Sequence, residues 1–250
     1  MSAPAAVPAR AVPQPIVALD RGSWTEAAAI VDVLGDGCDF YKVGSELFGG
    51  VGPAAVERLA ASGKRVFLDL KLHDIPNTVR GAARRASAAG ARLLTVHAIG
   101  GRAMMEAAVE GAREGGGDAP CDVLAVTVLT SLDPIALEQA LGRRVSSVAD
   151  EVVRLGAIAR AAGVAGVVCG GHEAVAVRAA YGESLRILVP GVRPAGAPRH
   201  DQARAVTPGE ASLAGASWVV LGRAVTGAPE PRAALAAIVR EMAQGASPKR

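Results

Sequence analysis

Short apolar runs alternate along the chain with longer stretches in which apolar residues recur every three or four positions. The short runs are typical of strands buried on both faces, and the longer spacing is typical of amphipathic helices. The pattern predicts eight strands, at 16–20, 40–44, a run that begins at 66, 93–98, 122–129, 166–170, 186–193 and 218–223. It predicts helices at about 23–34, 53–62, 77–89, 101–113, 146–161, 172–180, 208–214 and 231–243.

This order gives one strand followed by one helix, eight times over. Strict alternation implies a parallel sheet, and eight units favour a (β/α)8 TIM barrel, an α/β fold, over an open doubly wound sheet. No break in composition divides the chain, so we expect a single barrel domain over residues 16–244. Residues 1–15 are rich in alanine and proline and are expected to be a disordered N-terminal extension, with residues 245–250 as a flexible tail.

The third predicted strand carries charges where a buried strand should be apolar. Asp69 and Lys71 alternate with leucines, so both charged side chains share one face of the strand. Charges inside a barrel are rare unless they are paired or used in chemistry. A structural ion pair would explain Asp69 and Lys71 alone, but Asp74 adds a second carboxylate three residues on. Opposed groups of this kind often mark functional sites.

Charge and composition argue against a nucleic-acid-binding protein and against a membrane protein. The 250 residues carry a net charge of +3, and their basic residues are scattered without aromatic residues between them, so nucleic acid is not an expected partner. No apolar run approaches the roughly 18 residues that a membrane span needs, and no signal peptide is visible. The separated cysteines Cys38, Cys121 and Cys169 are expected to be buried free thiols. We therefore expect a cytoplasmic protein that does not bind membranes.

Polar residues end most of the predicted strands. In a TIM barrel the carboxyl ends of the strands meet at one rim, where the chemistry of such enzymes takes place. The candidates at this rim are Asp20, Lys42, Asp69 with Lys71, His97, Thr130 with Ser131, Arg193, and Gly222 with Arg223. We interpret His97 as a partly buried side chain. The four histidines have no metal-ligand spacing, so no metal site is predicted.

The ends of the seventh and eighth strands predict a phosphate site. Barrels commonly bind phosphate there through backbone N–H groups and the start of a short helix. Gly191 and Gly222 would let the backbone approach a ligand, and Arg193 and Arg223 would supply guanidinium groups. Two surface arginines are the alternative interpretation. The loop at 193–206, which contains Gln202, is expected to act as a lid.

These strand ends together resemble one known family. The segment FLDLKLHDIPNT, with Asp69, Lys71 and Asp74, resembles the signature of orotidine 5'-phosphate decarboxylase. Further matching motifs follow in order over residues 16–243: VALD, KVG, VHA before a glycine pair, AVTVLTS, PG with RP, and LGR. One such motif would be weak evidence, but the series in order is specific. Its spacing most resembles the bacterial form of the family.

The resemblance implies an activity that needs no cofactor. That activity is decarboxylation of orotidine 5'-phosphate to uridine 5'-phosphate, the last step of de novo UMP biosynthesis. The implied catalytic residues form an alternating charged network of Lys42, Asp69, Lys71 and Asp74. Lys71 would stabilise the carbanion at C6 of the pyrimidine and then protonate it, while Asp69 holds Lys71 in place. Such stabilisation is electrostatic, because the carbanion orbital lies in the ring plane and cannot delocalise into the ring.

The resemblance also implies how substrate is held and how the chains assemble. The implied substrate contacts are Asp20 and Lys42 at the ribose hydroxyls, Asp69 near the departing carboxylate, Thr130 beside the pyrimidine, Gln202 from the lid, and Arg193, Gly222 and Arg223 at the phosphate. Asp74 and Thr78 would reach into the site of the neighbouring subunit. We therefore expect a homodimer with shared active sites.

Three other functions stay open at this stage. A sugar-phosphate decarboxylase or aldolase of the same superfamily would share the D-x-K-x-x-D motif, but its Mg2+ is held partly at the end of strand two, where this chain has Lys42. A catalytically silent nucleotide binder would usually have lost a network residue. A phosphate-binding barrel isomerase would normally use an acidic base without two network lysines, and fold alone does not exclude it.

Overall fold

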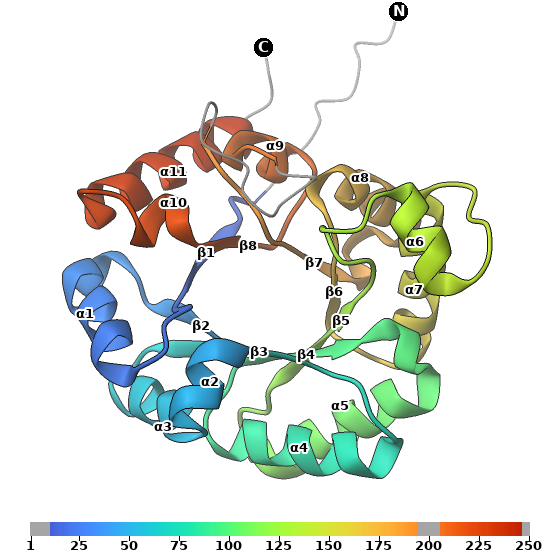
Figure 1. The fold of residues 1–250 in the computed structure, drawn as a ribbon, viewed down its shortest axis with the longest axis horizontal. Helices are drawn as coiled ribbons and strands as arrows, with labels where there is room; N and C mark the ends of the chain where they lie inside the picture. Colours follow the sequence, from blue (N-terminus) through green and yellow to red (C-terminus); the bar gives the residue numbers. More distant parts are fainter. Residues whose placement is uncertain (1–10, 195–205, 247–250) are drawn as a thin grey trace, which may run out of the picture.

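The computed structural model describes residues 11–194 and 206–246 of the chain. Eight parallel strands follow one another in sequence order around a closed barrel, with helices outside it (Figure 1). The strands are β1 (Gln14–Ala18), β2 (Phe40–Gly44), β3 (Arg65–Leu72), β4 (Leu93–His97), β5 (Asp122–Val126), β6 (Gly166–Val168), β7 (Arg186–Val189) and β8 (Trp218–Leu221). The predicted TIM barrel is confirmed.

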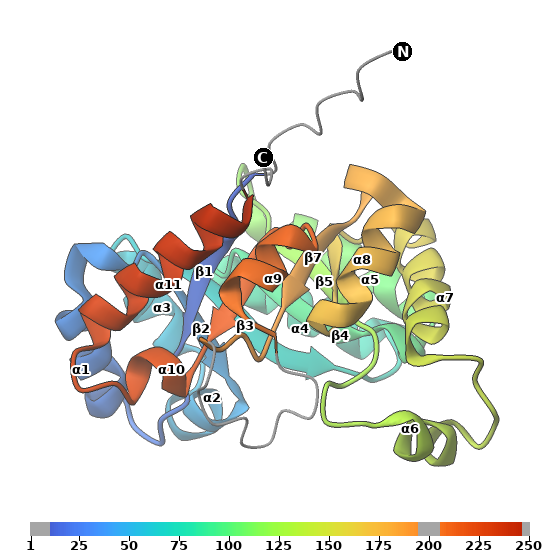
Figure 2. The same cartoon turned by 90° about the horizontal axis from the view of Figure 1, so that it is seen from above.

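The predicted helices are present, and three short ones are added to them. The predicted set comprises α1 (Trp24–Leu34), α3 (Ala54–Ala61), α4 (Pro76–Ala88), α5 (Arg102–Gly116), α7 (Val148–Ala161), α8 (Gly171–Tyr181), α9 (Pro208–Leu213) and α11 (Pro231–Ala246). The unpredicted helices are α2 (Ser45–Val51), α6 (Pro134–Leu141) and α10 (Arg223–Thr226). All three lie toward the carboxyl ends of the strands, at the bottom of Figure 2. They lengthen the loops of the functional rim.

The barrel extends slightly beyond the predicted domain bounds at both ends. Gln14 and Pro15, which were assigned to the N-terminal extension, pair with Trp218 and Val219 of β8. At the other end α11 continues through Ala246, two residues into the predicted tail. The pairing partner on β8 fixes the start of β1, and sequence pattern alone cannot reveal that partner. Residues 1–10 and 247–250 lie outside the described chain, so the predictions of disorder there are not tested.

Alternation along the strands divides the core into two regions. Residues such as Ile16, Phe40 and Phe67 fill the barrel interior, whereas their neighbours Val17 and Tyr41 pack outward against the helices. This is the side-chain period of two expected for strands that are covered on both faces. The interior is therefore a packed apolar layer that forms the floor of the rim above it.

Several strands end earlier than the apolar runs suggested. β5 ends at Val126, not at residue 129, β6 at Val168, and β7 at Val189, not at residue 193. Thr130 and Arg193 therefore stand in the loops that follow the strands. The apolar residues Val128 and Val192 lie beyond the strand ends and are buried, and Val192 forms an isolated bridge to Val206.

The cysteines agree with a further expectation. Cys38, Cys121 and Cys169 are buried thiols that form no disulfide, as predicted. Among the described residues, no helix combines the length and the apolar character needed to cross a membrane.

Helices α4 and α5 pack with their backbones in close contact. They lie outside the barrel beside β3 and β4 (Figure 1), and glycines on α5 permit the close approach of the two helices. A Cβ on Gly111 would overlap the carbonyl oxygen of Arg80, and one on Gly115 would overlap that of Arg84. Arg80 of α4 also forms an ion pair with Glu114 of α5. The two helices therefore form a tightly packed pair on this side of the barrel.

We expect Gly111→Ala to lower the free energy of unfolding by about 1–3 kcal/mol, because the added methyl group forces the two helices apart. Gly49→Ala is the matched control. Gly49 is an exposed helical glycine, and a Cβ added there would meet no other atom within 4 Å, so its replacement should be neutral or slightly stabilising. Urea denaturation of both variants measures the difference. Equal unfolding free energies for the two variants would contradict a tight α4–α5 contact.

Candidate active site

A cavity of about 670 Å³ opens at the carboxyl end of the barrel. Its wall draws residues from the ends of seven strands, including Asp20, Lys42, Lys71, Thr130 and Arg223. The volume lies within the range of pockets that bind small ligands, and a mostly apolar lining with a few polar groups is typical of them. The rim that the sequence predicted is thus a real pocket.

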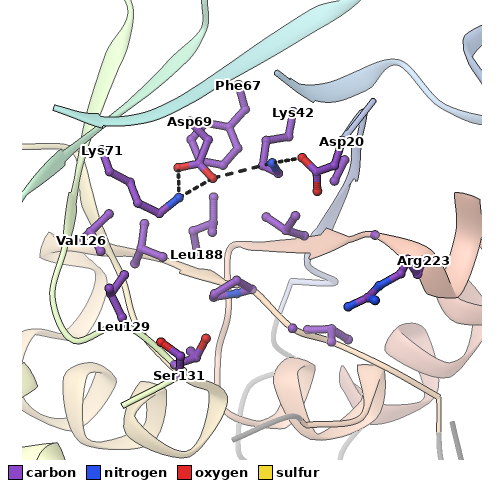
Figure 3. A pocket seen from close by; sticks show the side chains of 18 of the residues that line it. Asp20, Lys42, Phe67, Asp69, Lys71, Val126, Leu129, Ser131, Leu188 and Arg223 are labelled. Atoms are coloured by element: carbon purple, nitrogen blue, oxygen red, sulfur yellow. Dashed lines mark hydrogen bonds and ion pairs between the residues drawn. The ribbon is translucent and has the colours of Figure 1, made fainter. Parts of the chain in front are cut away.

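Four charged side chains form a row along one wall of this cavity (Figure 3). The Lys71 Nζ donates to both carboxylate oxygens of Asp69, at 2.9 Å each. The Lys42 Nζ lies 3.9 Å from the Asp69 Oδ2 and donates to the Asp20 Oδ1 at 2.7 Å. The signs therefore alternate from Asp20 through Lys42 and Asp69 to Lys71. Each charge in the row has a neighbour of opposite sign, which offsets the cost of holding it near the barrel interior.

Strand periodicity explains why these charges point inward. Asp20, Lys42 and Asp69 each follow a barrel-interior residue by two positions, namely Ala18, Phe40 and Phe67. They therefore continue the interior face one layer above the apolar floor. The side chains of Lys42 and Asp69 are only 11% and 13% exposed, whereas that of Lys71 is 38% exposed and reaches into the cavity.

Lys71 reaches the same face by an irregular route. The β3–β4 pairing is regular at Leu68↔Leu94 and resumes at Leu72↔Val96, so β3 sets residues 69–71 opposite the single residue Thr95. Lys71 has φ +50, and in the described chain no other non-glycine residue has a positive φ. Backbone strain of this kind concentrates at functional sites. Simple alternation predicted the shared face of Asp69 and Lys71, but the bulge was not predicted.

Gly44 is a site residue that the sequence analysis did not single out. A Cβ at Gly44 would lie 2.6 Å from the Lys42 Nζ and 3.0 Å from the Asp20 Oδ1. Only glycine leaves room for this ion pair in its present position. The KVG motif contained the signal, because a glycine that closes a strand often permits a close approach.

The predicted phosphate residues line the part of the cavity away from Lys71. Figure 3 places Arg223 on the opposite side of the pocket from Lys71. Gly191 follows β7 with φ +72, a conformation that favours glycine, and Gly222 precedes the short helix α10. Gly191, Arg193, Gly222 and Arg223 all line the cavity. Two guanidinium groups and the amino end of α10 make this region suited to an anion.

The connection after β5 forms another part of the wall. Thr130 and Ser131 line the cavity, ahead of α6. The far end of this connection is tied to α7, because Glu151 accepts from Arg143 at 2.7 Å and from Arg154 at 2.6 Å. Hydrogen bonds first from Arg154 and then from Arg143 lower the pKa of the buried Glu151 carboxyl to about 2. The ion pairs therefore anchor the segment that carries Thr130.

Asp74 and Thr78 stand apart from the cavity of their own chain. Both are exposed, and neither lines the pocket formed by the described residues. The Asp74 carboxylate accepts from the Ile75 N–H at 2.6 Å, and Ile75 itself is 67% exposed. Within one chain, the fourth charge of the row is consequently Asp20, and Asp74 is left available to another molecule.

His97 and Gln202 are the remaining residues that the sequence analysis named. His97 is partly buried, as expected, and burial followed by the nearby His73 and Lys71 lowers its imidazole pKa. The two histidine rings lie 5.7 Å apart. Gln202 falls outside the described residues. The described chain has no cluster of three or more histidine, cysteine or acidic side chains placed to share a metal.

Comparison with known proteins agrees with this geometry. Residues 13–238 match the model of the "Orotidine 5'-phosphate decarboxylase / HUMPS family". The chain is 53% identical over 221 residues to orotidine 5'-phosphate decarboxylase of Anaeromyxobacter sp. (strain K), which covers 88% of this chain and 94% of the relative. It is 47% identical to the enzyme of that name from Heliobacterium modesticaldum, over 92% of this chain and 96% of the relative.

Solved structures give the same result. The crystal structure of orotidine 5'-phosphate decarboxylase from Lactobacillus acidophilus superposes with a TM-score of 0.82 at 36% identity, covering 92% of this chain and 99% of that one. The enzyme of that name from Pyrococcus horikoshii OT3 superposes with a TM-score of 0.72 at 29% identity, covering 92% and 99%. The matched region takes in the whole barrel and its row of charges. This chain belongs to the orotidine 5'-phosphate decarboxylase/HUMPS family.

Proposed function

We propose that this chain decarboxylates orotidine 5'-phosphate to uridine 5'-phosphate without a cofactor, with Lys71 as the catalytic residue. The activity follows from membership of the family and from 53% identity to a relative of that name. It is the carboxy-lyase step that completes de novo UMP biosynthesis. The observation that carries the assignment to Lys71 is its Nζ, fixed 2.9 Å from both Asp69 oxygens and directed into the cavity.

The reaction needs a cation at the place where negative charge develops. Cleavage of the bond between C6 and the carboxylate releases CO2 and leaves the electron pair on C6. The Lys71 ammonium stabilises this pair and then transfers a proton to C6, and it recovers a proton from solvent. Asp69 holds the ammonium with two hydrogen bonds, so little reorganisation is needed as the charge forms. An oriented cation in a partly dehydrated site is worth far more than one in water.

The rest of the substrate would lie along the cavity from the row of charges to the arginines. Asp20 and Lys42 would hold the ribose hydroxyls, and Thr130 would lie beside the pyrimidine. Arg193, Arg223 and the N–H groups near Gly222 would bind the 5'-phosphate, at the far side of the pocket from Lys71. Binding of these non-reacting parts orients C6 over Lys71, which is how remote contacts contribute to the rate.

A homodimer with shared active sites belongs to the same proposal. Asp74, Ile75 and Thr78 are exposed at the carboxyl rim and do not line the cavity of their own chain in its described part. In a second copy, the Asp74 carboxylate would extend the alternating row beyond the Lys71 ammonium. Ile75, the exposed residue next to Asp74, supplies apolar surface for the contact between the two copies.

We also place the enzyme in the cytoplasm, with a small-molecule nucleotide as its partner and no role for nucleic acid. Three buried cysteines that form no disulfide are typical of a reducing compartment. The net charge of +3 is too small to indicate binding to a polyanion.

Two alternative functions can be distinguished from this proposal, one by the residue at the end of β2 and the other by measurement of turnover. A Mg2+-dependent sugar-phosphate enzyme would need an oxygen ligand near the end of β2. That position holds the Lys42 ammonium, 2.7 Å from Asp20, and a cation beside a metal ion is unfavourable. A silent nucleotide binder would bind uridine 5'-phosphate without turnover, so it is separated from an enzyme by measurement of the reaction.

Purified wild-type enzyme should consume orotidine 5'-phosphate in the presence of EDTA, and Lys71→Ala should lower kcat by about a thousandfold or more, because it removes the preorganised cation. The loss of pyrimidine absorbance follows the reaction. Binding of uridine 5'-phosphate to Lys71→Ala, measured by calorimetry, controls for folding. An inactive wild-type protein that still binds the nucleotide would identify a silent binder, and an enzyme that EDTA inactivates would refute the cofactor-free mechanism.

Arg223→Ala should raise the KM for orotidine 5'-phosphate roughly 10- to 100-fold, because the phosphate loses a charge-assisted hydrogen bond. The nucleoside orotidine, which has no phosphate, is the internal control. Its kcat/KM should be nearly the same for wild type and variant. A variant that impairs nucleotide and nucleoside equally would place Arg223 outside the phosphate site.

Shared sites can be tested by mixing two inactive variants. Lys71→Ala and Asp74→Ala should each be inactive as homodimers, but the mixed dimer contains one site with both native residues. After unfolding and refolding at equal concentrations, random pairing should restore about a quarter of wild-type activity. Each variant refolded alone is the control. If the mixture stays as inactive as the separate variants, each active site is complete within one chain.

A further inference from the structure

Thr95 stands behind the row of charges and has no role in the mechanism described above. It lies in the middle of β4, two positions beyond the interior residue Leu93, and its side chain is fully buried. It does not line the cavity formed by the described residues, so it does not meet the substrate there. A buried hydroxyl has to find hydrogen-bond partners, and the partners of Thr95 are the two central groups of the site.

The Thr95 hydroxyl makes two hydrogen bonds, one in each direction. Its oxygen accepts from the backbone N–H of Lys71 at 2.9 Å, and its proton is donated to the Asp69 Oδ1 at 2.8 Å. Asp69 in turn accepts from the Lys71 ammonium. The three bonds form a closed circuit from the Lys71 backbone through Thr95 and Asp69 to the Lys71 side chain.

The irregular register explains why this hydroxyl is needed. Because β3 sets residues 69–71 opposite Thr95 alone, the Lys71 N–H is displaced from the regular pairing with β4. The Thr95 side chain supplies the acceptor for this N–H. Lys71 holds φ +50, a conformation that non-glycine residues rarely adopt without support from their surroundings.

We propose that Thr95 is a positioning residue for decarboxylation, because it fixes the strained backbone of Lys71 and the carboxylate that orients its ammonium. The proposal rests on the proposed function of Lys71. One β4 residue then holds the backbone N–H of Lys71 directly and its ammonium through Asp69. A catalytic cation that is held in this way keeps its orientation as charge develops at C6. Loss of the hydroxyl should therefore weaken stabilisation of the transition state more than it weakens binding of the nucleotide.

Three variants test this role. Thr95→Val has nearly the same shape but lacks the hydroxyl, whereas Thr95→Ser retains it. Thr127→Val is the matched control: Thr127 is also buried, but its hydroxyl donates to the Val168 carbonyl at 2.7 Å and not to the charged row. For each variant we would measure kcat and KM for orotidine 5'-phosphate, affinity for uridine 5'-phosphate, and thermal unfolding.

Thr95→Val should lower kcat roughly 10- to 100-fold, as expected for loss of hydrogen bonds to a charged group and a strained amide. Its affinity for uridine 5'-phosphate should stay within a few-fold of wild type. Thr95→Ser should recover most of kcat, and Thr127→Val should lose stability without a selective loss of kcat. These results together would support the proposal.

Other outcomes would overturn it. A Thr95→Val enzyme with wild-type kcat would show that the hydroxyl does not position Lys71. A loss that serine does not recover, or one that Thr127→Val reproduces at equal stability, would assign Thr95 a structural role only. An inactive wild-type enzyme would instead be a failure of the proposed function, so the two failures are distinguishable.

Discussion

The ion pair between Lys71 and Asp69 is the constraint on which the rest of the site depends. The two residues come from one strand, and a cation and an anion two residues apart must both face the barrel interior. Regular β geometry allows the shared face but gives no control over the exact direction of the lysine. The bulge in β3 and the hydroxyl of Thr95 provide that control, since the hydroxyl accepts from the Lys71 backbone N–H and donates to the Asp69 carboxylate.

The neighbouring charges can be understood from the same requirement. In an isolated buried ion pair each ion has only one neighbour of opposite charge, and the removal of each ion from water is costly. Lys42 and Asp20 extend the pair into a row in which every ion has an opposite neighbour. The glycine at position 44 leaves space for this extension. A site with two fixed lysines can favour an anionic transition state while its own charges remain compensated.

The interior of the barrel serves stability, and the rim at the carboxyl ends of the strands serves function. Large apolar side chains fill the interior below the site, and the closely packed helices α4 and α5 lie outside the barrel. The irregular segment of β3 that carries Lys71 thus stands directly above a packed apolar layer. At the rim, by contrast, loops and the short helices α2 and α10 contribute to the wall, and the loops and α10 supply the anion-binding groups. The reacting cation therefore lies on a strand, whereas the groups suited to the anion lie mostly beyond the strand ends.

Much of this protein could be predicted from the order of its residues. The alternation of short apolar runs with amphipathic stretches determined the barrel, because strands buried on both faces and helices buried on one face leave different periods in a sequence. Asp69 and Lys71 were conspicuous for the same reason, since they interrupt an apolar run. The glycines and arginines that follow the last strands indicated the anion-binding side.

The tertiary structure decided the features that depend on contacts between distant segments. The sequence gives no sign that β3 sets three residues opposite Thr95, because a bulge is defined by two strands together. Thr95 looked like an ordinary strand residue until its neighbour across the sheet was known. Likewise, within one chain Asp20 joins the row of charges and Asp74 does not, since β1 pairs directly with β2 and the residues after β3 are exposed. Local periodicity determines which face a side chain takes, whereas the partner that it meets there is fixed only by the closed barrel.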